Sequence, residues 1–247
     1  NKMIDADTTN GLFSGSYTTG LHRTLAEMTK KHTVNQQVVG GNVTFTYSMI
    51  QFGITAVNTL LDNRLQPDKT TYNYFYFEAK QQTTAGLHYR MRWQKLNVFG
   101  ETAMTDNGAM ATINGFSFIP LSQVNLVVMH RYYSPEYDTF YATAFSETSR
   151  INNESGFYLG AEIRPYKKWK ISAYADSYRF PWAKYGIDVP SVGADYLLQA
   201  DYSARRHISM FWRFKYEEKQ GNVSQTESAM PVVAPIQKLS MRYSLSY

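Results

Sequence analysis

Apolar and polar residues alternate with a period of two along most of the chain. In the segment GLHYRMRWQ, residues 86–94, every aliphatic or aromatic side chain is separated from the next by a polar one. Successive side chains of a β-strand point to opposite faces of the sheet. The pattern therefore predicts a strand with one apolar face and one strongly charged face.

The same alternation recurs in segment after segment. A helical period of 3.6 is indicated only near the N-terminus, where LHRTLAEMTKK favours a short helix with Thr24 as its N-cap. Phe211 departs from the alternation, because it falls on the polar side of its segment. The predicted strands cover residues 36–48, 50–58, 86–94, 96–104, 109–119, 123–133, 156–165, 169–178, 194–202, 207–217 and 238–247.

Short and long connections alternate along the chain from residue 94 onward. Short turns are predicted near residues 95, 121, 166 and 205. Between them lie an Asp-Asn-Gly hairpin signal at 106–108 and three long loops, at 134–155, 179–193 and 218–237. Outer-membrane barrels have this asymmetry, with short periplasmic turns and longer outer loops. The aromatic segment 72–80 is interpreted as the wall of an outer loop, because an extra strand there would break the alternation.

The predicted fold is all-β, an antiparallel transmembrane β-barrel with short periplasmic turns and long outer loops. Residues 1–33 are expected to be an outer loop or short helix leading into the barrel, and residues 34–247 the barrel itself. About 11–12 strands are visible, and single-chain bacterial barrels have even numbers. We therefore expect these strands to be the later part of a larger barrel.

Composition narrows the alternatives. The chain has 247 residues, including 20 Tyr and 14 Phe, and amphipathic aromatic rings favour a boundary between apolar and wet phases. Mean hydropathy is −0.42 and no run approaches 18 apolar residues, which excludes a helical membrane protein. A soluble all-β sandwich is the alternative fold, but the polar faces carry too many charges to form its core.

Charge and cysteine content remove further classes. The net charge of +5 is spread along the chain without a basic block, so no nucleic-acid partner is expected. The absence of cysteine excludes disulfides and thiolate metal sites. His, Asp and Glu show no compact ligand spacing either, so we expect neither a metal nor a cofactor.

Several segments resemble a known family. GGNVTF, GAMATINGFSF, HRYYSPEYDTFYATAFSE and DVPSVGADYLLQ look like the barrel region of large outer-membrane proteins of Bacteroidota, often labelled only by a helix-hairpin-helix segment. The resemblance covers most of residues 20–215. It implies a barrel fold and location in the bacterial outer membrane. It implies no activity, because the biochemical role of the family is not settled.

Polar residues predicted to face the barrel interior are the first candidate site. Mixed charges there either pair and fill the lumen or line a polar channel whose selectivity they tune. The lumen-facing candidates are His88, Arg90, Arg92, Glu101, Glu162, Arg164, Asp176, Asp195, Arg213 and Lys215. The pattern of residues 123–133 leaves open whether His130 or Arg131 joins this set.

Two aromatic-rich loops are the second candidate site. The side chains expected to contact a partner or a neighbouring loop are Tyr133, Tyr137, Phe140, Phe180 and Trp182. A hydrolase-like site is the catalytic alternative, in which Glu136 and Asp138 orient the His130 side chain. No Gly-x-Ser-x-Gly motif accompanies it, so no catalytic residue is predicted.

The sequence thus predicts a non-enzymatic outer-membrane β-barrel that acts as a scaffold or component of an envelope transport or assembly complex. Its expected partners are outer-membrane lipid or lipopolysaccharide, and other envelope proteins. A passive diffusion porin is the first alternative, and an outer-membrane hydrolase is the second.

Overall fold

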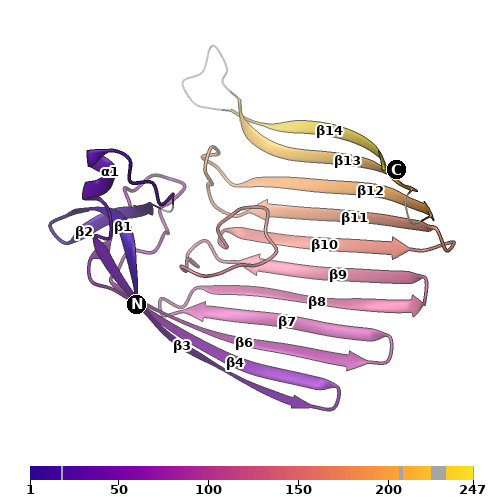
Figure 1. Cartoon of the computed structure of the whole chain (residues 1–247), viewed down its shortest axis with the longest axis horizontal. Coiled ribbons are helices and arrows are strands. Elements are labelled where there is room, and N and C mark those ends of the chain that lie inside the picture. Colours follow the sequence, from indigo (N-terminus) through magenta and orange to yellow (C-terminus); the bar gives the residue numbers. More distant parts are fainter. Residues whose placement is uncertain (18, 206–207, 224–231, 247) are drawn as a thin grey trace.

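One large, mostly antiparallel β-sheet forms the protein (Figure 1). The computed structural model describes residues 1–17, 19–205, 208–223 and 232–246. Its elements are β1 (Lys2–Thr9), β2 (Leu12–Tyr17), α1 (Leu25–Thr29), β3 (Val34–Tyr47), β4 (Ile50–Leu61), β5 (Arg64–Leu65), β6 (Gln81–Trp93), β7 (Leu96–Thr105), β8 (Met110–Leu121), β9 (Val124–Tyr133), β10 (Glu154–Ile163), β11 (Trp169–Phe180), β12 (Ser191–Arg205), β13 (Ile208–Val223) and β14 (Val232–Ser246).

The eleven predicted strands correspond to β3, β4 and β6 to β14, so the strand predictions are confirmed. The structural strands are mostly longer, and the loop predicted at 218–237 is wrong because β13 continues to Val223 and β14 begins at Val232. An ion pair along β13 accompanies this polar extension: Lys219 Nζ lies 2.8 Å from Glu217 Oε1. Pro235 pairs with Gln220 and lies on β14, the last described strand on this side of the sheet.

The connections divide between two ends of the sheet. The short connections at 48–49, 94–95, 122–123 and 164–168 define the turn end. The connections at 62–80, 106–109, 134–153 and 181–190 define the loop end. The predicted loop character of 72–80 is confirmed. β12 runs to Arg205, and the rest of the turn predicted near 205 falls on residues 206–207, which lie outside the described part of the chain.

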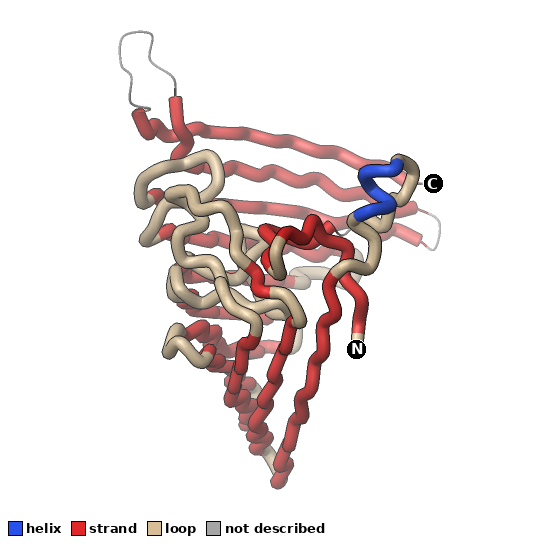
Figure 2. Tube along the Cα trace, turned by 90° about the vertical axis from the view of Figure 1, so that its left-hand side faces the viewer, coloured by secondary structure: helices blue, strands red, loops and turns tan. Residues whose placement is uncertain are grey.

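The sheet is curved but open (Figure 2). Hydrogen-bonded neighbours run from β14 at one side through β3 to β1, β2 and β5 at the other, and β14 does not pair with β3. β1 covers only residues 34–36 of the β3 edge. Both β3 and β14 run from the loop end to the turn end, so they point in the same direction along the sheet.

Residues 1–33 form more structure than expected. β1 and β2 make a hairpin whose turn, Asn10-Gly11, has positive φ at both residues, which is the Asn-Gly hairpin signal. This hairpin adds to the outer loop or short helix expected here. The predicted helix is confirmed as α1, with a Thr24–Glu27 capping box. A small core anchors this region to the loop ends of β3 and β4, and it consists of Ala6, Phe13, Val34 and Leu61.

The residue pairing separates two faces of the sheet. One continuous row, Phe116, Val128, Leu159, Ala175 and Tyr196, crosses β8 to β12 on what we call the apolar face. Its large side chains are solvent-exposed; Leu159 is 48% exposed. The opposite, polar face carries the charged residues of the same strands, and several of these are buried.

The N-terminal region provides a pH-dependent prediction. Asp5 accepts hydrogen bonds from the His32 backbone and pairs with His22, and these contacts lower the Asp5 pKa below 3.8. Because the folded pKa is depressed, the stabilisation is present above pH 3.8 and is lost as pH falls through the folded value. The hydrogen-exchange protection factors of residues 30–34 should fall on acidification below pH 3.8. The Asp5→Asn variant should exchange rapidly already at pH 5; equal protection in both proteins would contradict this role.

Candidate functional site

The polar face brings together residues that are distant in sequence. The register places His88 opposite Glu101 and Asp176 opposite Asp195, while Arg213 and Lys215 lie further along β13 on the same face. Within the predicted set, exposure differs widely: Arg90, Arg92, Glu101 and Arg164 are exposed, and Asp176 and Asp195 are buried. Glu162 and Arg164 pair with each other at 2.7 Å beside the turn after β10.

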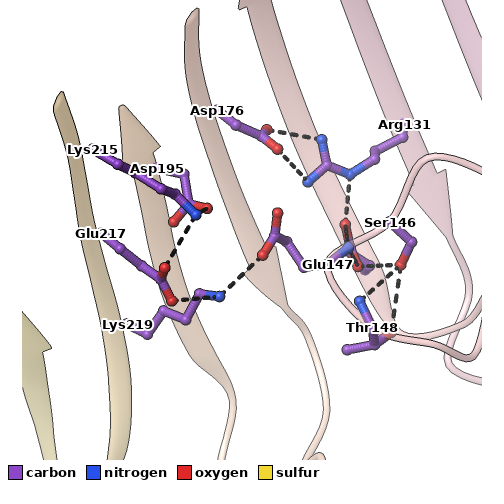
Figure 3. Close-up of polar contacts among 10 residues, drawn as sticks. Arg131, Ser146, Glu147, Thr148, Asp176, Asp195, Lys215, Glu217 and Lys219 are labelled. Carbon is purple, nitrogen blue, oxygen red and sulfur yellow. Dashed lines mark hydrogen bonds and ion pairs between the residues drawn. The ribbon is translucent and has the colours of Figure 1, made fainter. Parts of the chain in front are cut away.

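Arg131 is the centre of a buried charge network (Figure 3). Its Nε lies 2.5 Å from Glu154 Oε1, and its Nη1 and Nη2 donate to the two oxygens of Asp176 at 2.8 and 3.1 Å. All three side chains are at most 2% exposed. The guanidinium passes over Gly156, where an added Cβ would lie 2.6 Å from Arg131 Cζ. A larger residue at this position would displace the network.

The network fixes the loop at 134–153 onto the sheet. Glu154 Oε2 accepts hydrogen bonds from Ser146 Oγ at 2.7 Å and from the Glu147 backbone N–H at 3.0 Å. The Phe145 ring covers the Arg131 guanidinium, with its centroid 4.9 Å from Cζ. The polar face therefore gains a lid of loop residues directly above its buried charges.

A second cluster continues the network across β12 and β13 (Figure 3). Lys215 Nζ lies 3.2 Å from both Asp195 and Glu217, and Lys219 Nζ lies 3.2 Å from Glu147 of the same loop. Asp195 stands directly opposite both Asp176 and Glu217 on the neighbouring strands. Like charges in such positions repel each other, so the bridging cations are needed to hold this acidic row together.

Three loops meet over the loop end of the polar face, and we call residues 66–80, 134–153 and 181–190 the loop cap. Asp138 joins two of them, because its Oδ2 accepts from the Phe77 backbone N–H at 2.9 Å and from Arg150 Nη1 at 2.8 Å. Trp182 Nε1 donates to the Thr71 carbonyl at 2.8 Å. Tyr141 reaches Gln36 on β3 at 2.6 Å, so the cap spans from β9 to the opposite edge region of the sheet.

The predicted loop contacts are only partly available. Tyr133, Tyr137 and Phe180 are at most 3% exposed, so they are not available to a partner, and contact with neighbouring parts of the chain is the alternative that remains for them. Tyr133 and Tyr137 instead pack with Ile151 in a small core, and burial raises the Tyr137 pKa above its usual range. Phe140 is partly exposed, at 36%.

Trp182 is half-buried between loops, where its backbone and indole hydrogen bonds hold it. The most exposed aromatic residues of the cap are Tyr74, Tyr141 and Tyr185.

The hydrolase arrangement is not present. His130 lies on the apolar face opposite Phe157, whereas Arg131 occupies the polar face. Asp138 is engaged with Arg150 and Phe77, and Glu136 accepts a hydrogen bond from Ser134. The alternative in which these carboxylates orient His130 is therefore not supported, because alternation sends the His130 side chain to the other side of the sheet.

Sequence reasoning did not identify several members of the network. Glu154 falls within the predicted loop at 134–155. It is separated from Glu162 by an even number of residues, so if the predicted strand is extended to begin at residue 154, alternation places both side chains on the polar face. Lys219 lies beyond residue 217, the predicted end of its strand, so the alternation did not place it on the polar face either. Ser146 and Glu147 lie in a loop without periodicity, so no sequence signal marked them.

Two chemical features are absent from the described residues. No three His, Asp or Glu side chains in that part of the chain gather closely enough to hold a metal ion. Likewise, none of the described helical segments has the length and apolar character needed to cross a membrane as a helix.

Comparisons with protein-family models, with curated proteins and with solved structures find no match to this chain. The resemblance to Bacteroidota outer-membrane barrels stays a prediction from sequence motifs.

Proposed function

We propose that this chain forms a wall of an outer-membrane β-barrel and acts, without catalysis, as a scaffold or component of an envelope transport or assembly complex. One observation carries the proposal. Large apolar side chains are exposed along one face of the sheet, while Arg131, Glu154 and Asp176 are buried on the other. A soluble protein buries its apolar face, whereas a membrane barrel turns that face to lipid.

Strand dimensions support the same conclusion. The eleven long strands have 10 to 16 residues, and a tilted membrane strand needs about 9–11. Exposed aromatic residues such as Phe45, Trp93 and Trp212 lie on the apolar face, where amphipathic and aromatic rings favour a lipid boundary.

Closure requires strands beyond the eleven. Because β3 and β14 run in the same direction, an antiparallel barrel needs an odd number of further spanning strands between them. An open edge is not viable in lipid, where every backbone group must be paired. The β3 edge from residue 37 to 47 and the β14 edge are the positions at which those strands would add.

The loop cap favours a scaffold over an open channel. It crosses the polar face, and the buried ion network at Arg131 fastens it there. The exposed Tyr74, Tyr141 and Tyr185 then present aromatic contact area at the loop end. Such residues are enriched where proteins meet partners.

The first test is extraction and gel mobility. The protein should enter solution from membranes only with detergent, and its band should shift between unheated and heated samples. In planar bilayers it should show little steady conductance, whereas a diffusion porin would give large stepwise openings. A protein that stays soluble without detergent would disprove the membrane proposal.

A further inference from the structure

Phe211 is an aromatic residue on the polar face of β13, and two guanidinium groups lie over it. Arg213 Cζ is 5.4 Å from the ring centroid and Arg242 Cζ is 5.7 Å from it. Stacking on an aromatic face holds a guanidinium in a fixed orientation while leaving its N–H edges free to donate. The ring therefore positions two arginines side by side.

The two arginines stand directly opposite each other on β13 and β14. Like charges in this position are destabilising. Arg213 donates from Nε to Gln199 at 2.6 Å, but neither guanidinium has a carboxylate within ion-pair distance among the described residues. Elsewhere on this face the buried Arg131 and the partly exposed Lys215 each have two carboxylate partners. The Arg213–Arg242 pair thus lacks the counter-charge that the rest of the face supplies.

A cavity of about 540 Å³ opens at the turn end of β10 to β14. Phe211 is part of its lining, and Arg213 and Arg242 adjoin the cavity through that ring rather than lining it. Among the described residues that line it, Asp201 is the only carboxylate and lies 3.5 Å from Lys170 Nζ. The neighbouring Arg164 pairs with Glu162. Lys167 and Lys168 have no ion-pair partner among the residues that the structure describes. The remaining polar lining consists of hydroxyl groups, from Tyr202, Ser203, Ser209 and Ser244.

We propose that this cavity and the Arg213–Arg242 pair form a binding site for a small organic molecule or headgroup carrying a phosphate monoester. Guanidinium groups match phosphate oxygens bidentately, and ammonium and hydroxyl groups supply the further donors that a dianion accepts. The volume falls within the range of small-molecule sites and exceeds what a bare ion needs. Phe211 provides apolar area for the organic part of the ligand.

Calorimetric titration of the detergent-purified protein with glycerol 3-phosphate tests the site, with glycerol as the uncharged control. Arg242→Gln and Arg213→Gln should each weaken binding at least tenfold. The matched control is Lys238→Gln, a cation on the same strand and face opposite Glu217, and it should stay within twofold. Equal binding by Arg242→Gln and the unaltered protein would overturn the proposal, as would equal binding of glycerol.

Thermal unfolding gives an independent readout. Without phosphate, Arg242→Gln should unfold at the same or a higher temperature, because like-charge repulsion is relieved. Glycerol 3-phosphate should raise the unfolding temperature of the unaltered protein and leave that of the variant unchanged. A variant that is less stable without ligand would mean that the arginine pair is structural, and would overturn the site.

The source of the phosphate can be separated in the same system. Phosphatidic acid in mixed micelles competes with glycerol 3-phosphate if the site accepts a lipid headgroup, and fails to compete if it accepts only soluble phosphates. The site does not depend on the membrane proposal. If the protein binds glycerol 3-phosphate but needs no detergent, the barrel is rejected and the site is retained. If the protein needs detergent but does not bind glycerol 3-phosphate, the site is rejected and the barrel is retained.

Discussion

Replacing Arg131 by methionine is expected to destabilise the protein by about 3–5 kcal/mol, because removal of one partner from a buried ion network leaves uncompensated charge behind. Glu154 and Asp176 would then be two buried carboxylates without their cation. Denaturant unfolding of the reconstituted protein, followed by tryptophan fluorescence, measures the loss. The loop at 134–153 should also become sensitive to protease, since Glu154 would no longer be held by Arg131 in the position where it accepts hydrogen bonds from Ser146 and the Glu147 backbone.

The matched control is Arg150→Met. Arg150 pairs with Asp138 at 2.8 Å, but its side chain is 47% exposed, so its loss should cost about 1 kcal/mol or less. The triple variant Arg131→Met, Glu154→Gln, Asp176→Asn should be more stable than Arg131→Met alone, because it leaves no buried charge unpaired. If Arg131→Met and Arg150→Met cost the same, the buried network is not what fastens the loop cap.

The sequence predicted part of this network for a physical reason. Asp176, Asp195 and Lys215 lie in strands whose alternation is regular, so their shared face follows from parity alone. Around Arg131 the alternation weakens, because Val127 and Met129 share its side of β9. The choice between His130 and Arg131 could therefore be made only once cross-strand register was known.

The fold shows the same division between local and non-local information. Period-two alternation predicted all eleven long strands, because side-chain direction in a strand depends only on position along it. The Asn10-Gly11 dipeptide is a local hairpin signal that the prediction did not include. By contrast, the two-residue pairing of β5 with β2 and the lack of pairing between β3 and β14 are long-range features that no segment encodes by itself.

A charge on the apolar face distinguishes lipid from water as its surroundings. Leu159 lies near the middle of β10 on this face and is 48% exposed. If the face meets lipid, Leu159→Arg should destabilise the protein by about 2–4 kcal/mol in bilayers, as arginine does near the midplane of membrane barrels. If the face meets water, the same change at an exposed position should stay within about 0.5 kcal/mol.

The control and the logic of this experiment follow from geometry. Tyr166→Arg changes a residue that is 75% exposed in the turn after β10, outside the strands, and should be close to neutral in either setting. Refolding each variant into vesicles and comparing the free energies of unfolding gives the cost of the charge at each depth. A large cost for Leu159→Arg with a small cost for Tyr166→Arg requires an apolar medium around the middle of the strands, because nothing in the sheet itself covers Leu159. Equal, small costs would mean that the exposed apolar face is covered by neither lipid nor protein, and the barrel proposal would fail with them.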